Sequence, residues 1–278
     1  MVSITSSGSA PTTYSNAFLL PQMLEIKEII ENFIEAIYII YMIGLDVGSS
    51  AAKMVRFEDG KLQEYHILKT HKWKELLEYI GNKEVIYSTG YFRKIVPHKE
   101  SITEITAATF GAKHYFKEVE VIVDIGGQDT KVIDVINHKF NINDKCSAGT
   151  GAFLEFVAKY FGISLSDLGK LHYKAKNIAE INNTCGVFAI SEMISKLVEG
   201  YTMEDVIAGM HYAFARRISY MIPDADCIVV IGGTVKNKGI VSALEDILKK
   251  DLLIPEEPQI INAIGAVKYH VEGREVLL

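Results

Sequence analysis

The sequence predicts an α/β fold with two related domains that face each other across a cleft. Residues 44–62 and 122–140 resemble each other: when they are aligned on Asp46 and Asp124, a glycine and two lysines recur at the same offset. Strand-like apolar runs also alternate with helical patterns along most of the chain. A chain that opens twice with the same unit and then alternates strands and helices is typical of a duplicated α/β architecture.

Composition excludes several classes of protein. The chain has 278 residues, a net charge of −6 and no run of clustered Lys and Arg, so we expect no nucleic-acid partner. Three cysteines are too few, and odd in number, for a disulfide framework. This cysteine usage favours the reducing cytoplasm.

Residues 1–41 are expected to be an N-terminal extension, a partly disordered tail followed by a helix. The tail is polar and lacks the charged start and apolar stretch of a signal peptide. Charged residues interrupt the helical pattern that follows from Leu24 to Tyr38. The uncharged run from Ala36 to Leu45 is about half the length that a membrane helix needs, so we expect no membrane partner.

The first domain is expected over residues 42–118 and the second over 119–261, with a C-terminal helix, 262–278, that returns to the first domain. Each domain starts with an apolar run that ends in Asp-x-Gly, turns through small residues and resumes as an alternating strand, which predicts a hairpin. A third apolar run, 227–234, ends in paired glycines. Helical patterns cover 72–80, 101–110, 152–160, 187–199, 204–221, 241–250 and 262–272.

The glycine-rich turns predict a nucleotide site. A turn of Gly and Ser lets backbone N–H groups approach phosphate oxygens, and an Asp at the end of a strand can hold a hydrated Mg²⁺ or orient a water. One such turn also occurs without a ligand, but two related turns together with GGTVKN (232–237) and NAIGA (262–266) are hard to obtain by chance. Neither a Walker A lysine motif nor a G-x-G-x-x-G fingerprint is present.

These motifs and their order along the chain resemble those of the superfamily of actin, sugar kinases and heat-shock-chaperone ATPases. The resemblance implies two actin-like (ribonuclease H-like) domains around a cleft that binds ATP and Mg²⁺. It places Asp46, Gly48, Ser49 and Ser50 in a first phosphate loop and Asp124, Gly126, Gly127, Gln128 and Asp129 in a second. It assigns the adenosine to Gly232, Gly233 and Thr234, and the expected nucleotide site also includes Lys53 and Gly265. Asp46 and Asp124 would hold the Mg²⁺, and Gln128 or Asp129 would place the attacking water.

Two of the three cysteines precede helical patterns. Cys146 stands before a run of small residues and Cys185 before an amphipathic helix, so both are expected near helix N-termini, where the helix dipole favours a thiolate. Cys227 begins an apolar strand and is expected to pack in the core. From the residues alone, Cys146 and Cys185 are best interpreted as inert small side chains or a redox-sensing pair, since 38 residues separate them and no C-x-x-C motif is present.

The segments DIGGQDTK, NDKCSAGTG and CGVFAISE together resemble the activator component of 2-hydroxyacyl-CoA dehydratases, a family related to the ATP-binding subunits of benzoyl-CoA reductase. This resemblance implies a homodimer that shares one 4Fe-4S cluster through Cys146 and Cys185 of each subunit. ATP hydrolysis would drive an electron into a partner dehydratase or reductase component. Reduced ferredoxin or flavodoxin is the expected electron donor.

The chain departs from the family pattern at Phe92, Ala107, Ala108 and Ala152, where the family has a glycine, a Cys-His pair and a long polar residue. Glu192, on the helix after Cys185, is expected at the surface or at a dimer interface rather than at the nucleotide. Two alternatives use the same ATP loops. A small-molecule kinase of the actin fold would phosphorylate a sugar or an acid and would not need the two cysteines, and an ATP-driven chaperone or filament would need no metal.

Overall fold

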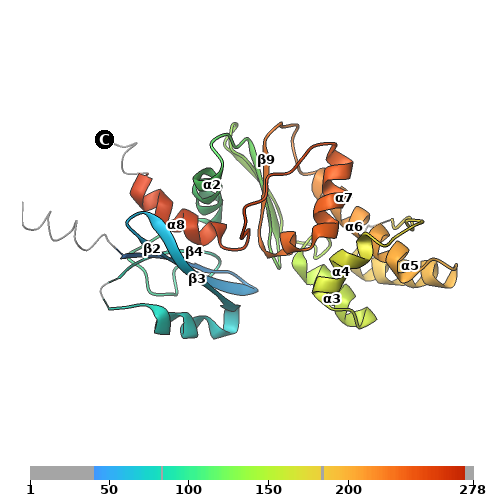
Figure 1. Cartoon of the computed structure of the whole chain (residues 1–278), viewed down its shortest axis with the longest axis horizontal. Coiled ribbons are helices and arrows are strands. Elements are labelled where there is room, and N and C mark those ends of the chain that lie inside the picture. Colours follow the sequence, from blue (N-terminus) through green and yellow to red (C-terminus); the bar gives the residue numbers. More distant parts are fainter. Residues whose placement is uncertain (1–40, 83, 183–184, 273–278) are drawn as a thin grey trace, which may run out of the picture. The chain divides into compact units, whose positions relative to one another are not determined.

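The computed structural model describes residues 41–82, 84–182 and 185–272, which contain two β-sheets and the helices packed on them (Figure 1). The predicted tail and helix of the N-terminal extension lie outside the described residues. Within the described part of the chain, no helix has the length and apolar character needed to cross a membrane.

The first sheet has the strand order β3-β2-β1-β4-β5. Its strands are β1 (Tyr41–Val47), β2 (Ala51–Glu58), β3 (Lys61–Lys69), β4 (Val85–Thr89) and β5 (Glu100–Ser101). Strands β1 to β3 form an antiparallel meander, which confirms the first predicted hairpin, and β4 runs parallel to β1.

The connection from β3 to β4 is a 3-10 helix, η2 (Thr70–Tyr79), where the sequence pattern predicted an α-helix over 72–80. Trp73 and the buried Leu76 pack against the first sheet from η2. They lie three residues apart, and a 3-10 helix places such a pair on one side. The position of this helix was predicted correctly, but its type was wrong.

The second sheet has the strand order β8-β7-β6-β9 and repeats the pairing of the first. Its strands are β6 (Val121–Ile125), β7 (Thr130–Asp134), β8 (Lys139–Asn143) and β9 (Ile228–Ile231). The β6–β7 hairpin is antiparallel, as predicted, and β9 runs parallel to β6. A single parallel bridge between Val229 and Leu253 occupies the place that β5 has in the first sheet.

The repeat seen in the sequence is also a repeat in strand register. Asp46 lies opposite Lys53 across the β1–β2 pair, and Asp124 lies opposite Lys131 across the β6–β7 pair. Each strand that starts a sheet therefore ends in an aspartate with a lysine beside it on the neighbouring strand.

Two helices distant in sequence, α2 (Glu104–Tyr115) and α8 (Ile261–Glu272), lie side by side (Figure 1). Helix α8 packs on β1, β2 and β4 of the first sheet, whereas α2 contacts β6 and β7 of the second. The contact between the two helices requires a glycine, because a Cβ on Gly111 of α2 would lie 2.1 Å from the Ile261 carbonyl oxygen. Gly44 of β1 likewise lets α8 approach the sheet, since a Cβ there would lie 2.0 Å from the Ala263 carbonyl oxygen. At such distances the helix backbones approach more closely than any side chain would allow.

The remaining helices belong to the second half of the chain. They are α3 (Gly151–Phe161), α4 (Leu165–His172), α5 (Gly186–Val198), α6 (Met203–Ser219), the 3-10 helix η3 (Gly233–Lys236) and α7 (Lys238–Leu248). The sequence analysis did not predict α4. Its signal is the cap, because Ser164 accepts a hydrogen bond from the backbone N–H of Asp167, three residues on.

Candidate active site

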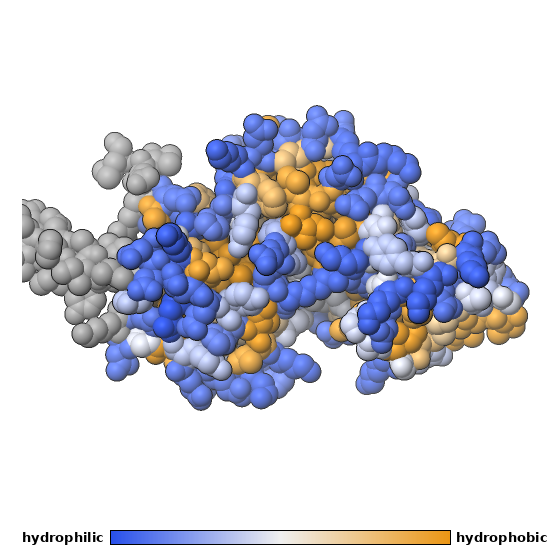
Figure 2. Space-filling view, in the orientation of Figure 1, coloured by the Kyte–Doolittle hydropathy of each residue, from blue (hydrophilic) through white to orange (hydrophobic). Residues whose placement is uncertain are grey.

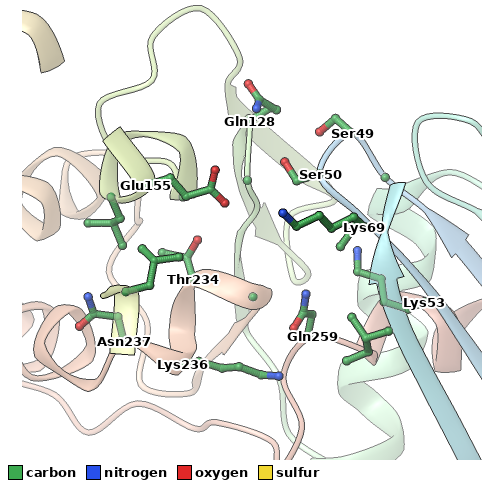
Figure 3. A pocket seen from close by; sticks show the side chains of 18 of the residues that line it. Ser49, Ser50, Lys53, Lys69, Gln128, Glu155, Thr234, Lys236, Asn237 and Gln259 are labelled. Atoms are coloured by element: carbon green, nitrogen blue, oxygen red, sulfur yellow. The ribbon is translucent and has the colours of Figure 1, made fainter. Parts of the chain in front are cut away.

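A pocket of about 840 Å³ lies where the turns after β1 and β6 approach the start of α2, α3 and η3 (Figure 3). Its polar lining includes Ser49, Ser50, Lys53, Lys69, Glu104, Gln128, Glu155, Ser166, Thr234, Lys236, Asn237 and Gln259. Ser50, Lys53 and Lys69 lie on one side, and Glu155, Thr234 and Asn237 on the other (Figure 3).

The two glycine turns have the same hydrogen bond and touch each other. The Gly48 N–H donates to the Ala51 carbonyl oxygen over 3.1 Å, and the Gly126 N–H donates to that of Asp129 over 2.9 Å. A Cβ placed on Gly127 would lie only 2.1 Å from Ser50 Oγ. The structure therefore brings together the two loops that the sequence predicted for phosphate binding.

Asp46 and Asp124 are buried below these turns. Asp46 Oδ2 accepts a hydrogen bond from Lys53 Nζ over 2.9 Å, while Oδ1 is buried with no hydrogen-bond partner among the described residues. Asp124 Oδ2 accepts from Asn262 Nδ2 over 2.9 Å. A buried carboxylate oxygen without a partner is costly, and a hydrated cation above it would satisfy it. The site thus fits a Mg²⁺ that is held mainly by nucleotide phosphates.

Lys131 is paired differently from its counterpart Lys53. Its Nζ lies 2.7 Å from each carboxylate oxygen of Asp129 and 3.4 Å from Glu104 Oε1. Burial alone would lower the pKa of Lys131, but the carboxylates of Asp124, Glu104 and Asp129 outweigh it and raise the pKa. Lys131 therefore stays charged, and it occupies both oxygens of Asp129, one of the two residues predicted to place the water.

Glu104 is a pocket residue that the sequence analysis missed. It is the first residue of α2, and Thr103 caps this helix by accepting a hydrogen bond from the Thr106 N–H. Burial raises the pKa of Glu104, Lys131 opposes this, and the charges of Asp46, Asp124 and Asp129 add to it. A threonine cap followed by an acidic residue was the available signal, since helix starts favour carboxylates.

The glycines predicted for the nucleotide fall into two groups. Gly233 lines the pocket. Gly232, the residue before it, has φ +98°, and a Cβ there would lie 2.5 Å from the Ile125 carbonyl oxygen, so both the backbone angle and the close contact require glycine. Gly265, in contrast, is buried in the contact between α8 and α2, where a Cβ would lie 1.8 Å from the Ala107 carbonyl oxygen. The structure therefore gives Gly265 a packing role and does not place it in the pocket lining.

Cys146 and Cys185 lie in two segments that contact each other. Cys185 is the N-cap residue of α5, and Cys146 lies in the loop that leads to α3. A Cβ on Gly186, next to Cys185, would lie 3.3 Å from Oγ of Ser147, next to Cys146. Both cysteines are half-buried, and neither is in a disulfide.

Cys227 and Glu192 each have a structural partner. The Cys227 thiol donates to the Glu118 carbonyl oxygen, and burial raises the pKa of that thiol. Cys227 is half-buried rather than packed in the core as predicted. Glu192 Oε1 accepts a hydrogen bond from the Asn182 N–H over 2.8 Å and so holds the segment before Cys185.

The fold and pocket are those of an ATPase with an actin-like architecture, as predicted. The model of the BadF/BadG/BcrA/BcrD ATPase family matches residues 43–269, and the chain belongs to this family. This membership confirms the family resemblance predicted from the sequence.

Characterised relatives match over nearly their whole length. The 2-hydroxyisocaproyl-CoA dehydratase activator of Clostridioides difficile is 34% identical over 251 residues, which cover 82% of this chain and 94% of the relative. The (R)-2-hydroxyglutaryl-CoA dehydratase activating ATPase of Acidaminococcus fermentans is also 34% identical, over 83% of this chain and 96% of the relative. The crystal structure of the activator of the 2-hydroxyisocaproyl-CoA dehydratase from Clostridium difficile with bound ADPNP has a TM-score of 0.78 and 32% identity, covering 85% of this chain and 97% of that chain.

Proposed function

We propose that this protein is an ATP-dependent electron-transfer activator of a 2-hydroxyacyl-CoA dehydratase-like or related reductase enzyme. Two copies of the chain hold one 4Fe-4S cluster through Cys146 and Cys185 of each. Mg²⁺ and ATP bind at the pocket, reduced ferredoxin or flavodoxin supplies the electron, and hydrolysis drives its transfer to the partner enzyme. The protein acts in the cytoplasm.

The observation that supports this proposal is a set of backbone hydrogen bonds between the turn after β6, at the pocket, and the start of α3, which follows the Cys146 loop. The Gly151 N–H donates to the Gly126 carbonyl oxygen over 2.9 Å, and the Ala152 N–H donates to that of Gly127 over 2.8 Å. Thr130 Oγ1 also donates to the Gly149 carbonyl oxygen. A movement of the second turn on hydrolysis therefore moves the start of α3 and the loop that contains Cys146.

The cysteines fit a cluster shared between two chains. A 4Fe-4S cluster needs four thiolates, and one chain offers two that are half-buried, free of disulfides and on segments in contact. The chain has three cysteines, so one copy cannot supply four thiolates. When bound, such a cluster supplies one-electron transfer at low potential.

Exposed apolar side chains on the helices that follow the two cysteines support an interface with a second copy of the chain. Helices α3 and α5 expose Phe156, Tyr160, Phe188, Ile194 and Val198. Hydrophobic residues gather around α5 on the face shown in Figure 2. Apolar residues grouped on one surface are typical of a protein interface, and a twofold axis here brings both pairs of cysteines together.

Within the pocket, we assign the positioning of the attacking water to Glu104 and Gln128. Both line the pocket, whereas Asp129 has both oxygens on Lys131. Glu104 has a raised pKa, which makes its carboxylate a better proton acceptor than an ordinary glutamate. Lys53 lies in the pocket beside Asp46 and provides positive charge for phosphate oxygens.

A small-molecule kinase is the weaker interpretation. It would use the same phosphate turns, but it gives no role to the backbone link from Gly126 to the Cys146 loop. The relatives named above are activators rather than kinases.

Anaerobic iron analysis tests the proposal. The wild-type protein should be a brown dimer with about four irons per two chains. Cys146→Ala and Cys185→Ala should each lose the iron, and Cys227→Ala, the matched control, should keep it. A monomer without iron, or iron retained by either Cys146→Ala or Cys185→Ala, would contradict the proposal.

A further inference from the structure

A chain of three side chains leads from the wall of the pocket into the buried interior of the second half of the molecule. Asn237 lines the pocket, and its Nδ2 lies 3.1 Å from His211 Nε2. His211 Nδ1 lies 3.3 Å from His172 Nδ1. The residues come from three elements, since Asn237 caps α7, His211 lies on α6 and His172 ends α4. Neither histidine has a role in the chemistry assigned above.

The hydrogen bonds fix which atom donates at each step. The Gly239 N–H donates to Asn237 Oδ1 over 3.0 Å, which identifies Oδ1 as the carbonyl oxygen and Nδ2 as the donor toward His211. His211 Nε2 is then an acceptor, so its proton is on Nδ1 and is donated to His172 Nδ1. Both rings are therefore neutral, in keeping with burial, which lowers the pKa of His211 to about 3 and lowers that of His172.

The residues around Asn237, His211 and His172 hold these three side chains in one arrangement. His211 is 0% exposed, and a Cβ on Gly239 would lie 2.6 Å from its Nδ1. A Cβ on Gly169 would lie 3.0 Å from Asn237 Oδ1. Gly169 and Gly239, on neighbouring helices, thus allow the backbone to pack directly against these side chains. A flip of the Asn237 amide would break its hydrogen bonds to both His211 and Gly239.

We propose that His211 is a positioning residue that holds the Asn237 amide so that it recognises the adenine base of the bound nucleotide. With one N–H used by His211 and one lone pair used by Gly239, the amide retains one donor and one acceptor for a ligand. Adenine presents a matching donor and acceptor at N6 and N7, whereas guanine presents two acceptors at O6 and N7. Asn237 lies beside Thr234 on the wall opposite Lys53 (Figure 3), away from the phosphate turn of β1. The inference rests on ATP binding in this pocket and not on the cluster.

Two substitutions of His211 separate positioning from packing. In His211→Gln the amide oxygen can take the place of Nε2 and still accept from Asn237. In His211→Asn the shorter amide can replace only Nδ1, so the bond to Asn237 is lost. Isothermal titration of the full chain with Mg·ADP and Mg·GDP measures the preference for adenine without hydrolysis. The wild type and His211→Gln should prefer ADP, while His211→Asn should lose about tenfold of that preference.

Asn237→Asp provides an independent test, because aspartate keeps the helix cap but lacks the donor. It should bind ADP and GDP with nearly equal affinity while keeping the wild-type melting temperature within a few degrees. An equal loss of the ADP preference in His211→Gln and His211→Asn, or an unchanged ADP preference in Asn237→Asp, would overturn this inference but not the ATP site. A wild-type protein that binds neither nucleotide would overturn the ATP site as well, and an iron-free protein that prefers ADP would leave the inference intact.

Discussion

The backbone N–H of Gly151 and the carbonyl oxygen of Gly126 are joined by a hydrogen bond of 2.9 Å, which fastens the start of α3 to the turn after β6. The same turn contacts Ser50 of the other hairpin through Gly127. Gly126 and Gly127 thus contact both the turn after β1 and the helix that follows the Cys146 loop. Hydrogen bonds therefore connect the second turn to the segment that directly follows Cys146.

Gly127→Ala should uncouple the two turns. The added methyl group would overlap Ser50 Oγ, and relieving that overlap costs about 1–3 kcal/mol. If the turns must approach in the reactive state, kcat/KM for ATP falls on the order of tenfold. Phosphate release measures the effect. Gly81→Ala is the control, since the nearest atom to its Cβ is 3.5 Å away. Wild-type rates in Gly127→Ala would show that this contact is not part of the reactive state.

The sequence predicted the two hairpins and their glycine turns because their signals are local. Asp-x-Gly after an apolar run specifies a strand end and a tight turn, and the matching lysines repeat with the same offset. The role of Gly265 was not predictable in this way, because its neighbours Ala107 and Gly111 are far away in the sequence. A glycine in a turn and a glycine between two helices give the same local pattern.

The assignment of the catalytic carboxylates shows the same limit. Asp129 stands next to the predicted phosphate turn, but its partner Lys131 became visible only with the β6–β7 register and the side-chain contacts. Glu104 lies outside every motif and reaches the pocket only because α2 begins there. The motifs therefore predicted residues that line the pocket, while the side-chain partners of its carboxylates follow from contacts between distant segments.

Glu104→Gln should reduce ATP hydrolysis about 10²- to 10⁴-fold while leaving ADP affinity nearly unchanged, because the amide keeps the shape but cannot accept a proton. Steady-state phosphate release and ADP titration together measure this separation. Asp129→Asn should weaken the bonds to Lys131 and have the smaller effect on kcat. Glu75→Gln, at an exposed ion pair with Lys72, is the neutral control. An Asp129→Asn defect larger than that of Glu104→Gln would reverse the assignment.

Gly265→Ala should destabilise the fold rather than act on the nucleotide. The new Cβ would meet the Ala107 carbonyl oxygen, which forces α8 away from α2 and lowers the free energy of unfolding by about 1–3 kcal/mol. Chemical denaturation with and without ADP measures both effects. The ADP affinity of the folded fraction should match that of the wild type. A stable protein with weakened ADP binding would instead restore the nucleotide role predicted for Gly265.

Asp205 should make stability sensitive to acid. Its carboxylate accepts backbone N–H bonds from Asn177 and Lys176, each over 2.8 Å, and forms a capping box with Thr202. The Asn177 bond, followed by the Thr202 hydroxyl, lowers the pKa of Asp205 to about 2. The folded pKa lies below the unfolded one, so the stabilisation is fully present above about pH 4 and is lost as the pH falls toward 2.

Asp205→Asn should therefore cost about 1–2 kcal/mol at neutral pH, through the lost charge-assisted bonds to the backbone. The same variant should lose less stability than the wild type between pH 4 and pH 2, because its amide does not titrate. Urea unfolding at a series of pH values measures both slopes, with Asp251→Asn at an exposed position as the matched control. Parallel curves for Asp205→Asn and the wild type across this range would show that Asp205 does not carry the acid sensitivity.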